Sequence, residues 1–261
     1  MIELSVVIIT LNEEARLGRC LESLPEGVEV VILDSGSTDK TVEVATKRGA
    51  RTATRPFDDY ASQKNAAIAL ASRRWILSLD ADEVLSPIFV QKVVQFVSSP
   101  EGNSTQDAFK VLRRLNFMGK VMFFGKTSDR PTRLFLRGSG KFYAKVHEQF
   151  KLDSGQVRRA PFGRGAHILH YSYENLTDYF DKFNRYTSRI AELRANNEAT
   201  QPRRGSLAFA GHVSRPFFEF FSRYVLRLGF LDGYPGYCYA LISSFYAFVK
   251  YAKLIERSQK S

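Results

Sequence analysis

The chain has 261 residues, 44% of them apolar and 25% charged, a composition that suits a folded protein with one sizeable core and excludes a disordered or fibrous one. Two cysteines are too few for a disulfide framework or a cysteine-based metal cluster, and they favour a reduced, cytoplasmic setting. The net charge of +11 is uneven, because residues 1–100 carry 11 basic and 14 acidic side chains while residues 101–261 carry 27 and 13. The second part is therefore expected to bind an anionic partner, whether phospholipid, phosphorylated glycan or nucleic acid.

Strand and helix patterns alternate over the first hundred residues. Apolar runs rich in Val and Ile predict buried strands, which we place at residues 4–10, 28–33 and 75–79, with a shorter strand at 51–54. Helical patterns lie between these runs; two of them end near Pro25 and Gly49, and the third covers residues 60–71. This alternation predicts right-handed βαβ units, and hence an α/β fold with a mainly parallel sheet flanked by helices.

Polar segments follow three of the predicted strands. These segments are Asn12–Glu14, Asp34–Asp39 and Asp80–Glu83. Ligands of parallel α/β sheets bind beyond the carboxyl ends of the strands. The sequence therefore predicts that the three segments face one shared crevice.

Asp80 and Asp82 are the most informative pair in that crevice. If strand geometry persists past the end of the strand, residues two apart project to one face, so both carboxylates can approach one cation. A divalent cation in that position neutralises the diphosphate of a nucleotide sugar as it leaves. The alternative interpretation is a solvated acidic loop after a strand.

Asp34, at the second strand end, is placed to recognise a base. Its carboxylate can accept a hydrogen bond from the imide N–H of uracil, with Thr10 and Asn12 framing the ring. The alternative is that residues 34–39 form only a turn with a helix cap, which their composition also permits. Lys64 can meet a phosphate in this crevice or be an ordinary surface lysine.

Regular alternation stops after residue 100. Short strands are expected at residues 108–114, 133–136 and 142–150, and a helical pattern returns over residues 174–197. Beyond a linker at 202–205, residues 207–256 carry dense aromatic side chains interleaved with Arg and Lys. This pattern predicts an interfacial helix pair on an anionic membrane surface, and the alternative is ordinary packing over the sheet.

The motifs described so far resemble family-2 glycosyltransferases of the GT-A fold. The matching segments are residues 4–14, 33–41, 63–65 and 79–83, in the family's order and spacing. Further on, residues 146–148, 170–173 and 229–233 resemble the bacterial lipopolysaccharide core β-1,4-glucosyltransferase group. The resemblance covers almost the whole chain.

The resemblance implies an inverting hexosyltransferase that depends on Mn²⁺ or Mg²⁺ and moves glucose from UDP-glucose onto a lipopolysaccharide inner-core or related lipid-linked acceptor. Residues 1–100 would be the nucleotide-sugar-binding half, 101–200 the acceptor-binding half, and 201–261 a basic, aromatic helical extension at the membrane. The implied donor-binding residues are Thr10, Asn12, Glu13, Asp34, Ser35, Gly36, Lys64, Asp80 and Ala81. Asp82 would be the more direct metal ligand, with Asp80 beside it.

Inversion requires a base near the acceptor hydroxyl, since the attacking oxygen loses its proton as the new bond forms. Glu148 is our candidate, and Asp129 is the competitor. His147 would either be a further metal ligand or orient Glu148.

Three rival functions stand beside this prediction. A family-2 enzyme acting on capsule, another polysaccharide or a protein keeps the chemistry and changes the acceptor. A sugar nucleotidyltransferase would need a Gly-rich loop after the first strand, where this chain has Leu11–Glu14. A nucleic-acid-binding protein would use the basic second half, but no binding signature for nucleic acid accompanies it. We expect no nucleic-acid partner and a cytoplasmic protein, peripheral on the inner membrane.

Overall fold

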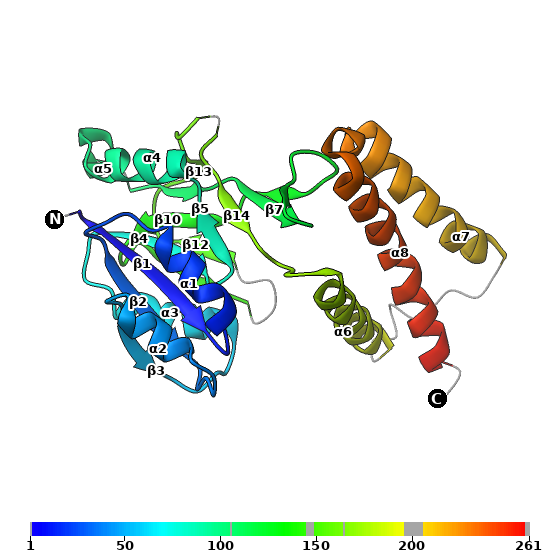
Figure 1. The fold of residues 1–261 in the computed structure, drawn as a ribbon, viewed down its shortest axis with the longest axis horizontal. Helices are drawn as coiled ribbons and strands as arrows, with labels where there is room; N and C mark the ends of the chain where they lie inside the picture. The colour runs from blue at the N-terminus through cyan, green and yellow to red at the C-terminus, as the bar shows by residue number, and fades with distance from the viewer. Residues whose placement is uncertain (1, 105, 145–148, 164, 196–205, 259–261) are drawn as a thin grey trace. The chain divides into compact units, whose positions relative to one another are not determined.

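A computed structural model describes residues 2–104, 106–144, 149–163, 165–195 and 206–258 (Figure 1). The chain divides into two compact units. Unit 1 comprises Met1–Arg113 and Asp129–His170, and unit 2 comprises Arg114–Ser128 and Tyr171–Ser261. These units group residues by contact, so the functional division at residues 100 and 200 stays a prediction.

Unit 1 is built on a sheet with the strand order β13-β6-β10-β4-β1-β2-β3 among the described residues. Its strands are β1 (Leu4–Thr10), β2 (Glu29–Asp34), β3 (Arg51–Thr54), β4 (Trp75–Asp80), β6 (Ala108–Lys110), β10 (Thr132–Leu136) and β13 (Val157–Arg159). β1 runs parallel to β2 and β4, and β2 runs parallel to β3, so the predicted parallel core is confirmed. β10 enters antiparallel between β4 and β6.

Alternate residues of β1 face two separate cores, which is why its sequence is apolar throughout. Val6 and Ile8 share one core with Leu17 and Phe89, whereas Val7 shares the other with Ala67 and Phe142. The helices of this unit are α1 (Glu14–Glu22), α2 (Thr41–Lys47), α3 (Tyr60–Ala69), α4 (Pro87–Val97) and α5 (Pro100–Ser104). The sheet is therefore covered on both faces, as parallel sheets require.

Side-chain caps fix where two of these helices begin. The Asp59 carboxylate accepts a hydrogen bond from the backbone N–H of Ser62 at the start of α3, and the Ser86 hydroxyl accepts one from Phe89 at the start of α4. Such caps satisfy N–H groups that have no partner within the helix. Since α3 carries Lys64, the cap at Asp59 also sets the position of that lysine.

Short strands complete unit 1. β5 (Glu83–Leu85) pairs antiparallel with β14 (Ile168–His170), and β11 (Gly140–Tyr143) pairs with β12 (Gln149–Leu152). The single strand predicted over residues 142–150 is thus wrong, because the described residues form two antiparallel strands there. The strand predicted over 108–114 is likewise divided into β6 and β7 (Arg113–Phe117).

Unit 2 contains mostly helices. They are α6 (Leu176–Ala195), α7 (Ser206–Phe221), a π-helical turn (Ser222–Leu226), a 3-10 turn (Gly229–Asp232) and α8 (Gly233–Ser258). Both α6 and α7 pack against α8. The unit also holds the antiparallel pair of β7 and β8 (Lys120–Val121), and β9 (Ser128–Asp129) lies at the boundary of the two units. No helix within the described ranges has both the length and the apolar character needed to cross a bilayer.

The turn before α8 is held by one buried carboxylate. Asp232 accepts hydrogen bonds from the backbone N–H groups of Phe123 and Phe124, at 3.0 and 2.9 Å, and is 2% exposed. Asp232 therefore ties the loop after β8 to the start of α8.

Candidate active site

The carboxyl ends of β1, β2 and β4 lie at one edge of the sheet, as predicted. The parallel register pairs Thr10 with Asp34 and Ile9 with Asp80. The Thr10 hydroxyl donates to the Asp34 carboxylate at 2.8 Å. Three polar strand ends are therefore neighbours in space although up to 70 residues separate them in the chain.

Asp34 holds the loop that follows it. Its carboxylate accepts hydrogen bonds from the N–H of Gly36 and from both the N–H and the hydroxyl of Ser37, at 2.6–2.9 Å, in addition to the one from Thr10. Burial acts to raise the pKa of Asp34, but these hydrogen bonds outweigh it and lower the pKa. A carboxylate has about four acceptor positions, and in Asp34 the chain's own donors fill them. A contact between Asp34 and uracil stays a prediction.

Two loops next to Asp34 are cross-linked to each other. Asn12 accepts from the N–H of Thr38 at 2.9 Å and donates its own N–H to the Ser37 hydroxyl at 2.8 Å. The N–H of Glu13 donates to the Thr41 hydroxyl at 2.7 Å. These loops and the strand ends before them contain most of the predicted donor-binding residues: Thr10, Asn12, Glu13, Asp34, Ser35 and Gly36.

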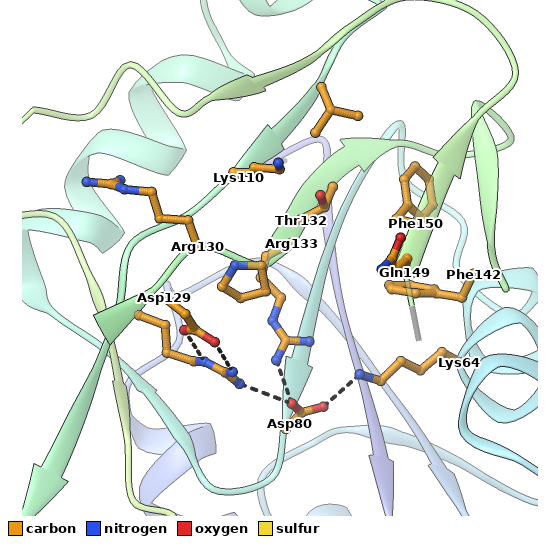
Figure 2. A pocket seen from close by; sticks show the side chains of 13 residues that line it. Lys64, Asp80, Lys110, Asp129, Arg130, Thr132, Arg133, Phe142, Gln149 and Phe150 are labelled. Atoms are coloured by element: carbon orange, nitrogen blue, oxygen red, sulfur yellow. Dashed lines mark hydrogen bonds and ion pairs between the residues drawn. The ribbon is translucent and has the colours of Figure 1, made fainter. Parts of the chain in front are cut away.

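Asp80 lies among three cationic side chains, those of Lys64, Arg133 and, at 3.8 Å, Arg113 (Figure 2). Lys64 Nζ is 3.0 Å from Asp80 Oδ1, and Arg133 Nη2 is 2.5 Å from Asp80 Oδ2. Burial alone would raise the pKa of Asp80, but Arg133 and Lys64 hold it well below its usual range. The alternative interpretation of Lys64 as a surface lysine is wrong, because this residue is 3% exposed.

Glu83 forms ion pairs with both Arg113 and Arg133. It is fully buried, and its Oε1 lies 2.5 Å from Arg133 Nη2 and 2.8 Å from Arg113 Nη1. Its other oxygen accepts the backbone N–H of Asp80 at 3.0 Å. Glu83 thus fixes both the arginines and the start of the Asp80–Glu83 turn.

Asp129 is paired with Arg113 through two hydrogen bonds of 2.9 and 2.6 Å. Burial acts to raise the pKa of Asp129, and the arginine outweighs it and lowers the pKa. A general base works best with a pKa near the operating pH, so this pairing makes Asp129 poorly suited to that role. The other predicted base, Glu148, lies outside the described residues, as does His147.

The second motif carboxylate has a different partner. Asp82 Oδ2 is 3.4 Å from Nε2 of His170, at the end of β14. Asp80 and Asp82 therefore face different groups, and the described residues contain no cluster of three or more His, Cys, Asp or Glu side chains able to hold a metal. One carboxylate and one imidazole still suit a divalent cation such as Mn²⁺, whose remaining positions water and diphosphate oxygens can fill.

Four residues at this site were not assigned roles from the sequence: Glu83, Arg113, Arg133 and His170. Arg113 and Arg133 lack any local motif, and the only hint of them is the basic excess after residue 100. His170 lies in a segment that resembles the core-transferase group, but the pattern alone gave no reason to place it beside Asp82.

A cavity of about 570 Å³ opens beside Asp80 within unit 1 (Figure 2). Its lining has five basic side chains and two acidic ones. The lining residues are Lys64, Asp80, Lys110, Arg113, Asp129, Arg130, Pro131, Thr132, Arg133, Phe142, Gln149, Phe150 and Val157. An anionic ligand is the natural occupant of such a cavity.

Comparison with known proteins agrees with this geometry. The profile of "Glycosyl transferase family 2" matches residues 5–149. The lipopolysaccharide core biosynthesis glycosyltransferase LpsC of Rhizobium meliloti is 31% identical, over 97% of this chain and 92% of its own length. An uncharacterized glycosyltransferase of Rickettsia felis is 27% identical over the whole chain and 92% of its own length.

Two solved structures are also similar. Glucosyl-3-phosphoglycerate synthase from Mycobacterium tuberculosis, crystallised with Mn²⁺, UDP and glucosyl-3-phosphoglycerate, is 28% identical over 44% of each chain, with a TM-score of 0.33. TarS of S. aureus is 14% identical over 99% of this chain and 92% of the solved one, with a TM-score of 0.43. The family match, together with the mainly parallel sheet and its flanking helices, confirms the GT-A fold class that the sequence predicted. This chain is a glycosyltransferase and belongs to glycosyl transferase family 2.

Proposed function

We propose that the protein is an inverting, metal-dependent hexosyltransferase that moves glucose from UDP-glucose onto an acceptor in the lipopolysaccharide inner core or a related lipid-linked glycan. One observation carries the proposal: three carboxylates lie at one edge of the sheet. Asp34 and Asp80 end the strands on either side of β1, and Asp82 follows Asp80 by two residues. Asp80 is paired with Lys64, and Asp82 with His170. That arrangement suits a ligand made of a base, a diphosphate and a sugar.

Lys64 serves the diphosphate. The Lys64 side chain is almost fully buried, and its ammonium group lies beside Asp80. A cationic group is therefore fixed at the end of β4. A phosphate oxygen entering here meets a fixed cation rather than a flexible surface lysine, and such preorganised charge stabilises a leaving group. Asp80 positions Lys64 and Arg133 for this purpose.

Asp82 and His170 would hold the divalent cation. When bound there, the cation would neutralise charge on the leaving diphosphate. Asp80 contributes less to this site than Asp82, because its oxygens are already bonded to Lys64 and Arg133. His147 would be a further ligand, as the sequence predicts.

Glu148 is the base in this proposal. Asp129 is less suited, since Arg113 lowers its pKa and engages both of its oxygens. A base at Glu148 would take the proton from the acceptor hydroxyl as that oxygen attacks the anomeric carbon.

The acceptor proposal draws on a relative. LpsC, which is 31% identical to this chain over nearly its full length, is described as a lipopolysaccharide core biosynthesis enzyme. Capsule, another polysaccharide or a protein are the alternative acceptors within the same chemistry.

Unit 2 supports attachment to the cytoplasmic face of the inner membrane. Phe217 and Phe218 of α7 are 74% and 65% exposed, and Tyr234 at the start of α8 is 70% exposed. An apolar groove of about 440 Å³ lies between α7 and α8. Arg215 on α7 and Arg227 after the π-helical turn are both exposed, so aromatic rings and cations are available together for an anionic lipid surface.

A donor screen tests the proposal. The purified protein is incubated with UDP- and GDP-sugars in the presence of Mn²⁺ or Mg²⁺, and release of the nucleotide is measured. Cation-dependent hydrolysis selective for UDP-glucose supports it, while selectivity for another donor, or hydrolysis that chelation leaves unchanged, contradicts the donor or the metal part.

A further inference from the structure

We infer that the cavity beside Asp80 binds an acidic group of the acceptor, a phosphate or a carboxylate carried on a sugar, through Lys110 and Arg130. The inference deepens the proposed function and rests on it, since it concerns the acceptor of the same site.

Three of the five basic side chains in the cavity have carboxylate partners. Lys64 and Arg133 are paired with Asp80, and Arg113 is paired with Asp129 and Glu83. The remaining two, Lys110 and Arg130, are exposed, and their side chains make no hydrogen bond or ion pair with any residue in the described ranges.

The cavity therefore keeps two cations whose charge nothing in the described structure neutralises. Lysine and arginine are the side chains that bind phosphate and carboxylate groups most strongly, through charge-assisted hydrogen bonds. An acidic ligand group is the partner that each of these two side chains lacks among the described residues.

Strand order separates this pair from the donor. The predicted nucleoside and diphosphate residues lie on β2, β1 and β4, whereas Lys110 lies on β6, on the far side of β10. With neighbouring strands about 4.8 Å apart, β6 is roughly 10 Å from β4. A donor spread from Asp34 to Asp80 leaves the β10–β6 side of the sheet for the acceptor.

The other walls of the cavity suit a sugar ring. Phe142 and Phe150 supply aromatic surface, and Thr132 and Gln149 supply polar atoms. A cavity of about 570 Å³ is also within the range of roughly 300–1,000 Å³ usual for small-molecule sites. Together, these walls and the two free cations predict an acceptor sugar with one acidic substituent.

Calorimetric titration tests the inference with three probes: glucose 6-phosphate, glucuronic acid and glucose. Each is titrated into the protein with and without saturating UDP and Mn²⁺. We expect at least one of the two acidic sugars to bind more tightly than glucose, and the double variant Lys110→Ala/Arg130→Ala to weaken its binding by about tenfold or more. The phosphate and carboxylate probes show which acidic group is preferred.

The matched control is Lys92→Ala, which removes a cation from α4 that does not line the cavity. It should bind all three probes as the unaltered chain does. The inference is overturned if glucose binds as well as both acidic sugars, if the double variant binds the acidic sugars normally, or if UDP displaces them. A separate titration of UDP with Mn²⁺ into the same protein measures donor binding, so a failure of the proposed donor site is distinguished from a failure of the acceptor subsite.

Discussion

Lys64 Nζ lies 3.0 Å from Asp80 Oδ1, and only 4% of the lysine side chain is exposed. A long cationic side chain from α3 is thus fixed at the end of β4, where a diphosphate would arrive. Lys64→Met keeps the length and removes the charge. We expect kcat/KM for the sugar donor to fall by on the order of 10²-fold, as when one preorganised donor to a developing anion is lost.

Initial-rate kinetics over a range of donor concentrations check this. The control is Lys47→Met on α2, because Lys47 is 73% exposed and, among the described residues, its ion pair is with Glu43. Wild-type kcat/KM in Lys64→Met would remove Lys64 from the donor site.

The proposed cation site predicts the same loss of metal binding when either of two side chains is removed. Since Asp82 and His170 face each other at 3.4 Å, Asp82→Asn and His170→Ala should each weaken Mn²⁺ binding in the presence of UDP, by about 10–100-fold. Electron paramagnetic resonance of free Mn²⁺ measures this without turnover. Glu43→Gln, an exposed carboxylate change on α2, is the control. Full Mn²⁺ affinity in both site variants would place the cation elsewhere.

The assignment of the base predicts an asymmetry between two carboxylates. Glu148→Gln should lower kcat by roughly 10²–10⁴-fold with donor binding intact, the usual contribution of a general base. Asp129→Asn should lower kcat far less, because its partner Arg113 already holds this carboxylate. Steady-state kinetics with acceptor in excess compares the two. If Asp129→Asn lowers kcat more than Glu148→Gln does, then Asp129 is the base and Glu148 is not.

Asp34 predicts a dependence of stability on pH. Its folded pKa is lowered by hydrogen bonds from Ser37, Thr10 and Gly36 that outweigh burial. A lowered carboxyl pKa stabilises the fold above the unfolded pKa of about 3.9, and this contribution is lost as pH falls through that value towards the folded pKa. Asp34→Asn should therefore destabilise the protein at pH 7 and differ less from wild type near pH 3.

Urea unfolding at both pH values measures the two free-energy differences. Thr10→Val, which removes one of the hydrogen bonds, should lie between wild type and Asp34→Asn at pH 7. If Asp34→Asn lowers the free energy of unfolding equally at both pH values, then ionisation of Asp34 does not contribute to the stability of the fold.

Unit 2 predicts lipid binding through exposed rings. Replacing Phe217 and Phe218 with Ser should reduce co-flotation with vesicles of phosphatidylglycerol and phosphatidylethanolamine, since both rings are largely exposed on α7. Phe57→Ser in unit 1, also an exposed ring, is the control. Unchanged flotation of the double variant would exclude this surface as the membrane contact.

The sequence predicted the strands and the polar edge because both depend on local pattern. The apolar runs before Asn12, Asp34 and Asp80 mark buried strands, and parallel order brings their ends together. The pattern did not indicate that Lys64 and Arg133 bind Asp80, and the expectation that Asp80 and Asp82 share one cation stays a prediction.

Long-range partners were beyond reach of local pattern. Arg133 and Asp80 are 53 residues apart, and Arg113 and Glu83 are 30 apart, so no periodicity links them. His170 and Asp82 are similarly distant in the chain and meet because β14 pairs with β5. These side chains meet because of the order in which the strands pair. The sequence pattern after residue 100 did not predict that order.

The cross-links between Asn12 and Ser37 and between Glu13 and Thr41 have a kinetic consequence. Loops that hold each other without a ligand have already lost the conformational entropy that a disordered pocket would lose on binding. The nucleotide should then associate in a single step, at a rate proportional to its concentration, with no slow isomerisation to limit it.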